Sequence, residues 1–67
     1  MVRLKVKQLC KERGMSMGKL SRVADIDYNT VKRLFDDRNY SPTIDTLYKV
    51  AKALHVTVND LIEEADD

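Results

Sequence analysis

The sequence is short of the residues that give many small domains covalent or metal-based stability. It holds one cysteine, Cys10, and one histidine, His55, in 67 residues. A lone cysteine excludes an intrachain disulfide, and together with a single histidine it excludes the usual Cys/His zinc sites. Because so small a core leaves a thin stability margin, regular helix packing or association must supply the rest. We therefore expect no metal and no cofactor.

Helix breakers and long apolar runs are also scarce. The only proline is Pro42, and the only glycines are Gly14 and Gly18, which favours helices joined by short turns. No apolar run approaches the ~20 residues that a membrane span needs, and no signal peptide is visible. These absences predict one soluble, cytoplasmic domain over residues 1–67, with no membrane partner and no second domain to hold a small-molecule ligand.

Catalytic groups in a converging arrangement are missing as well. His55 lies where a helix C-cap is expected, and Cys10 lies on an apolar helix stripe. The acidic pairs at 36–37 and 63–64 are neighbours in polar segments, not carboxylates brought together from different elements. There is no glycine-rich phosphate-binding loop. We therefore expect no enzyme and no catalytic residue.

The net charge of +1 conceals a strong asymmetry along the chain. Residues 1–40 hold ten Lys and Arg against five acids, a charge of +5, whereas residues 41–67 hold two against six, a charge of −4. This division favours a surface for a polyanion, with the acidic part facing away from it. The alternative is ordinary solvated charge, because charge blocks are common on soluble domains.

Apolar spacing and capping residues predict an all-α, five-helix bundle. Residues 2–7 alternate apolar and charged, a strand signal, before a first helix over about Leu4 to Arg13 that ends at Gly14. The fifth helix is expected to carry Val58, Leu61 and Ile62 and to be followed by a frayed acidic end. The clearest apolar stripe belongs to the fourth helix: Ile44, Leu47, Tyr48, Ala51 and Leu54. The last four helices begin after capping residues: Ser16, Asp27, Thr43 and Thr57.

Residues 16–35 predict a helix-turn-helix, because two short helices are joined there by a turn of three to four residues. In such a motif the second helix lies in the DNA major groove. Arginine can pair with guanine and asparagine with adenine. A merely solvated face would favour Glu and Lys, yet this helix has no acid between Asp27 and Asp36. The residues suited to base edges are Tyr28, Asn29, Thr30 and Arg33.

These residues resemble the lambda-repressor-like helix-turn-helix family, also called the Cro/CI or XRE type. The similarity lies in residues 16–34 and again in residues 42–62, and extends over about Leu4 to Ile62. It implies a five-helix bundle that binds duplex DNA, usually as a transcriptional regulator and often as a dimer. The positions matching Tyr28, Asn29, Thr30 and Arg33 face base edges in the family, and those matching Met17 and 38–41 touch phosphates.

The sequence departs from the family pattern at several of these positions. Met17 stands where the family often has glutamine, so that only backbone N–H groups remain there for a phosphate. Asp25 and His55 replace common glycines, and Asp27 places an anion where the reading helix meets DNA. The complete set of expected phosphate contacts is Ser16, Met17, Lys19, Lys32, Arg38, Asn39, Tyr40 and Ser41.

Two hypotheses for the function follow. The first is a sequence-specific regulator that binds double-stranded DNA, with the third helix in the major groove. The second is an antitoxin-like or adaptor module that uses the same bundle to bind a protein. Cations in residues 1–40 favour the first, and the acids at 25, 27, 36 and 37 favour the second. A homodimer is possible, with Val58, Leu61 and Ile62 as its candidate surface.

Overall fold

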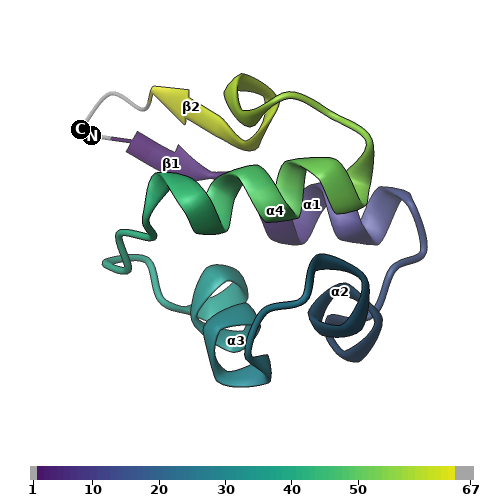
Figure 1. Cartoon of the computed structure of the whole chain (residues 1–67). Helices are drawn as coiled ribbons and strands as arrows, with labels where there is room; N and C mark the ends of the chain where they lie inside the picture. Colours follow the sequence, from purple (N-terminus) through teal and green to yellow (C-terminus); the bar gives the residue numbers. More distant parts are fainter. Residues whose placement is uncertain (1, 65–67) are drawn as a thin grey trace.

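The structure is a computed structural model that describes residues 2–64 (Figure 1). Over these residues it forms four α-helices, one 3₁₀ turn and a two-stranded sheet. No helix in this part of the chain is both long and apolar enough to cross a membrane. The elements are, in order, β1 (Val2–Leu4), α1 (Val6–Glu12), α2 (Met17–Ala24), α3 (Tyr28–Asp36), α4 (Ile44–Leu54), the 3₁₀ turn (Val58–Leu61) and β2 (Ile62–Glu64).

The predicted helix ends are confirmed by the hydrogen bonds of their caps. Ser16 accepts from the Lys19 amide at 3.1 Å, and Asp27 accepts from the Asn29 amide at 3.1 Å. Each bond satisfies a donor that the first helical turn leaves without a partner. Three further helix-end residues behave as the sequence predicts: Thr43 caps α4, and both Gly14 and His55 take the left-handed conformation.

A fifth helix does not form, and the all-α prediction is wrong to this extent. The capping box of Thr57 and Asp60 is present, but it opens only one 3₁₀ turn. The chain then extends at Ile62, because Ile62–Glu64 pairs antiparallel with Val2–Leu4. The acidic residues Glu63 and Glu64, expected to fray, therefore lie in a strand. The rest of the expected frayed end, residues 65–67, lies outside the described residues.

The sheet brings the two ends of the described chain together. Leu4 lies opposite Ile62, and Arg3 lies opposite Glu63, with 3.8 Å between their charged groups. The alternating pattern at residues 2–7 is thus confirmed as a strand at its start. Because that strand occupies Val2–Leu4, α1 begins at Val6, two residues later than the sequence predicts.

One apolar cluster joins all four helices and the 3₁₀ turn. Helix α4 is its centre and packs against α2, α1 and the 3₁₀ turn. Figure 1 shows α4 between the sheet on one side and the α2–α3 pair on the other. No side-chain polar atom of the described residues is buried without a hydrogen bond. The buried members include Val6, Cys10, Leu20, Val31, Leu34, Leu47, Val50, Ala51, Leu54 and Leu61.

The predicted apolar stripes are only partly correct. Ile44 is 73% exposed, Tyr48 is 54% exposed and Val23 is 53% exposed. On α4 the buried face instead includes Val50 and Ala53, so that the face is rotated relative to the predicted stripe. Tyr48 still has a local partner, since the Lys52 ammonium lies 5.5 Å from its ring centroid.

The C-terminal apolar residues are occupied within the chain. Leu61 is completely buried, and Val58 and Ile62 pack against the core cluster. The sequence suggested that these three residues offered surplus apolar surface for a dimer. Leu61 is not available for such a surface, whereas Val58 and Ile62 are half-buried, so the apolar surface left for a partner is smaller than the sequence suggests.

Cys10 gives a direct test of this core. The side chain is completely buried on α1, and burial raises the pKa of its thiol, although nearby Arg13 partly opposes the shift. A thiol must be both exposed and deprotonated to react quickly. We therefore expect an aromatic disulfide reagent at pH 8 to label native protein at least about tenfold more slowly than urea-unfolded protein. Equal rates would show that Cys10 is exposed.

Candidate nucleic-acid interface

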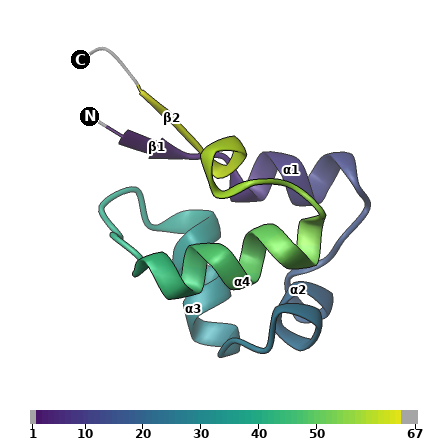
Figure 2. The ribbon, with the colours of Figure 1, turned by 45° about the horizontal axis from the view of Figure 1, so that its top comes forward.

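Helices α2 and α3 form the predicted helix-turn-helix at the end of the molecule opposite the sheet (Figures 1 and 2). The turn between them is held by hydrogen bonds to Ser21. Its carbonyl accepts from the Ile26 amide at 3.1 Å, and its hydroxyl donates to the Ile26 carbonyl at 2.7 Å. Asp25 takes φ 57°, a left-handed conformation that aspartate tolerates better than most residues. The turn therefore does not need the glycine that the family often has.

Helix α3 has a buried side and an exposed polar side. Val31 and Leu34 enter the core, whereas Asn29 and Arg33 are exposed. Because residues four apart share a helix face, Asn29 and Arg33 lie together on the side away from the core. Of the other two predicted base-contacting residues, Tyr28 is 46% exposed and Thr30 is half-buried.

The predicted phosphate contacts lie in three segments. Ser16, Met17 and Lys19 begin α2, Lys32 lies on α3, and the rest follow α3 at 38–41. Ser16, Lys19, Lys32, Arg38, Asn39 and Ser41 are exposed. These side chains are accessible to an anion at the surface.

Two predicted phosphate contacts have side chains that also belong to the core. Met17 and Tyr40 are half-buried and pack against the apolar cluster. The thioether of Met17 offers no donor, so that its contribution to phosphate binding is limited to the backbone. No hydrogen bond among the described residues uses the amides of Met17 and Gly18, which remain free at the α2 N-terminus, where a helix favours anions.

The loop after α3 is ordered by two hydrogen bonds to Asp37 and by a contact with α3. The Asp37 carboxylate accepts from the Asn39 amide at 2.9 Å, and the Asp37 carbonyl accepts from the Tyr40 amide at 3.2 Å. The Arg33 guanidinium carbon lies 5.8 Å from the Tyr40 ring centroid. This cation–π contact was not predicted, because it joins a helix to a loop and leaves no periodic signal in the sequence.

Two of the four acids in this region, Asp27 and Asp37, have local structural roles. Asp27 caps α3, and Asp37 closes the following loop, each through a backbone amide. These roles account for Asp27 and Asp37 without a protein partner, and both carboxylates keep their negative charge. Asp25 and Asp36 are exposed and carry no such hydrogen bond in the described part of the chain.

Comparison with known proteins agrees with this geometry. The family model of the Cro/C1-type helix-turn-helix DNA-binding domain matches residues 5–67 of this chain. A solved structure of a candidate DNA-binding protein from Bacteroides fragilis is similar, with a TM-score of 0.81 and 27% sequence identity over 94% of this chain and 100% of that chain. No curated protein matches the chain. The chain belongs to the Cro/C1-type helix-turn-helix DNA-binding domain family.

Proposed function

We propose that this protein is a sequence-specific transcriptional regulator that places α3 in the major groove of double-stranded DNA. The observation that carries the proposal is the exposed pair Asn29 and Arg33 on α3, on the side away from Val31 and Leu34. Asparagine and arginine are the side chains best suited to bidentate contacts with adenine and guanine. Tyr28 and Thr30 flank this pair and complete the proposed base-contacting set.

The phosphate contacts of the proposal surround α3. The exposed groups at the start of α2 and in the 38–41 loop hold the two strands of the backbone and set the register of α3, while Lys32 adds charge on α3 itself. The free amides of Met17 and Gly18 add donors at the α2 N-terminus. These contacts supply affinity that depends on salt rather than on base sequence.

The protein is further proposed to bind as a homodimer on two half-sites. One module of this size makes few phosphate contacts, and helix-turn-helix proteins commonly place two copies about one DNA turn apart. A complex of two chains on one duplex, observed by sedimentation at rising protein concentration, supports this part of the proposal. A one-to-one complex on a site without two-fold symmetry contradicts it.

Salt titration tests the DNA-binding proposal. The parent protein should bind a random-sequence duplex with an affinity that falls steeply with salt, since phosphate contacts release counterions. Lys32→Ala should reduce the slope of log affinity against log salt by about one and weaken binding to all sequences alike. Lys49→Ala, an exposed lysine on α4, is the matched control and should leave the slope unchanged.

Binding by fluorescence anisotropy at two salt concentrations is sufficient to measure these slopes. No salt-dependent duplex binding by the parent protein would contradict the proposal and leave the protein-binding alternative. An equal loss of slope in Lys32→Ala and Lys49→Ala would contradict the assignment of the contact surface to the α2–α3 side.

A further inference from the structure

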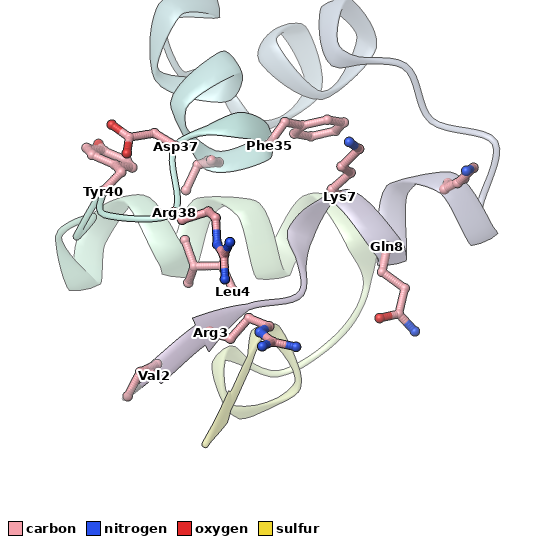
Figure 3. A pocket seen from close by; sticks show the side chains of 11 residues that line it. Val2, Arg3, Leu4, Lys7, Gln8, Phe35, Asp37, Arg38 and Tyr40 are labelled. Atoms are coloured by element: carbon pink, nitrogen blue, oxygen red, sulfur yellow. The ribbon is translucent and has the colours of Figure 1, made fainter. Parts of the chain in front are cut away.

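A groove lies between the N-terminal segment and the loop that follows α3 (Figure 3). Its volume is about 600 Å³, and β1 and α1 form one wall. Figure 3 shows β1 between this groove and the pale ribbon of β2, so that β2 lies on the far side of β1. Apolar and aromatic side chains line it from both walls: Leu4, Leu34, Phe35 and Tyr40.

The groove is strongly cationic. Four basic side chains line it against the single carboxylate of Asp37. Arg3 is 3.8 Å from Glu63 on the neighbouring strand, whereas Lys7, Lys11 and Arg38 form no ion pair among the residues that the structure describes. Three cations are thus available to an occupant. The four basic residues are Arg3, Lys7, Lys11 and Arg38.

The edge of β1 that faces away from β2 is not paired. The Lys5 amide donates to the Leu61 carbonyl at 2.7 Å, which continues the ladder of β1 and β2. Because alternate residues of an antiparallel strand direct their amides to opposite edges, Arg3 faces β2 with Lys5, while Val2 and Leu4 face the other side. The groove therefore borders backbone groups that can pair with another strand.

We propose that this groove binds an extended, acidic segment of a partner protein, which adds to the free edge of β1 as a third strand. The partner segment alternates apolar and acidic residues. Its apolar side chains lie against the apolar and aromatic side chains that line the groove, and its carboxylates lie near Lys7, Lys11 and Arg38. The chain's own sheet uses the same chemistry on the other edge, where Ile62 and Glu63 of β2 lie opposite Leu4 and Arg3. Strand addition to a sheet edge is a common mode of peptide recognition.

A second copy of the chain fits this groove less well. Antiparallel pairing of β1 with its own copy, using all of the strand, sets Arg3 directly opposite Arg3 of that copy, and like charges in that position are destabilising. Pairing of the outer edge of β2 with β1 of another copy is not reciprocal and leads to an open chain of molecules rather than a closed dimer. The acidic partner segment has neither difficulty.

The groove takes Leu34 and Phe35 from the end of α3 and shares two residues with the proposed DNA contacts. Arg38 and Tyr40 line the groove and belong to the proposed phosphate-contacting loop. Phosphates need neither an apolar floor nor a free strand edge, so that these two features favour a peptide over DNA as the occupant. Lys7 and Lys11 lie outside the proposed DNA-binding set, which makes them suitable for a separate test.

The experiment measures binding of a fluorescent, short peptide that alternates isoleucine and glutamate. We expect saturable binding to the full chain, and at least about tenfold weaker binding to the variant that combines Lys7→Glu with Lys11→Glu, since two exposed charge pairs become repulsive. The combination of Lys49→Glu with Lys52→Glu on α4 is the matched double charge reversal and should stay within about twofold of the parent. A peptide N-methylated at every second residue should not bind, because it cannot pair with β1.

Three outcomes overturn the proposal. The first is no binding of the alternating peptide, and the second is equal binding of the N-methylated peptide. The third is equal weakening by the double variant on α4, which indicates non-specific attraction. If the first outcome is joined by a loss of affinity of the Lys7/Lys11 double variant for random-sequence duplex, the groove is assigned to DNA. Weaker duplex binding in Lys32→Ala, with peptide binding intact, distinguishes the two sites.

Discussion

Replacing Leu20 by alanine is expected to remove about 2–5 kcal/mol from the free energy of unfolding. Leu20 is completely buried on α2, in the cluster that also holds Val31 of α3 and Leu54 of α4. The loss combines the transfer free energy of the removed carbons with the cost of the cavity that remains. Because a domain of this size has a total stability near the lower end of 5–15 kcal/mol, this one change can unfold it.

Val23→Ala on the same helix is the matched control for Leu20→Ala. Val23 is 53% exposed, so its truncation should change the unfolding free energy by less than about 0.5 kcal/mol. Urea unfolding followed by circular dichroism measures both variants. A Leu20→Ala protein with the midpoint of the parent, or a Val23→Ala protein with the larger loss, contradicts the packing of α2 described above.

Loss of the proposed base-contacting side chains has the second large expected effect. Arg33→Ala and Asn29→Ala should each weaken binding to the preferred DNA site by about 1–3 kcal/mol, because each removes a proposed bidentate base contact. Both residues are exposed on α3, and their truncation leaves the core unchanged. Both variants should lose affinity in anisotropy titration, and Asn29→Ala should keep the unfolding midpoint of the parent in urea unfolding.

The contact of Arg33 with Tyr40 gives this prediction a second component. Since the Arg33 guanidinium lies over the Tyr40 ring, Arg33→Ala removes a loop contact as well as a base contact. Arg33→Lys keeps the charge but not the planar, bidentate group. If Arg33 reads a base, Arg33→Lys should still lose most of the preference at that base pair. Full retention by the lysine variant would indicate that charge alone accounts for the role of Arg33.

The parts of the fold that the sequence predicts correctly depend on local interactions. Ser16, Asp27 and Thr43 cap helices through amides two or three residues away, and the residues involved are adjacent in the chain. His55 and Gly14 end helices through their own backbone conformations. Signals of this range are contained within a few residues, which is why the sequence alone locates the helix-turn-helix and α4.

The parts that were missed depend on contacts between distant segments. Apolar spacing at Val58, Leu61 and Ile62 fits a helix as well as a turn followed by a strand, and the pairing of Ile62 with Leu4 decides between them. A strand partner some sixty positions away leaves no local signal. The exposure of Ile44 and Tyr48 has a similar origin, because the arrangement of α2 and α1 around α4 determines which side of α4 is buried.

In the candidate site, too, features that depend on local spacing were predictable and contacts between separate elements were not. The polar composition of α3 and its spacing predicted the exposed pair Asn29 and Arg33, because both follow from helix periodicity and from the positions of Val31 and Leu34. The cation–π contact to Tyr40 and the groove along β1 were not predictable, since each joins side chains from separate elements.

Selection of bound sequences from a random duplex pool, carried out in parallel with the parent protein and Arg33→Ala, tests most directly whether α3 reads DNA. The parent should enrich one motif, and Arg33→Ala should enrich the same motif with the preference lost at one base pair and retained elsewhere. Failure of the parent to enrich any motif, or an Arg33→Ala motif identical to that of the parent, would contradict the assignment of α3 as the reading helix.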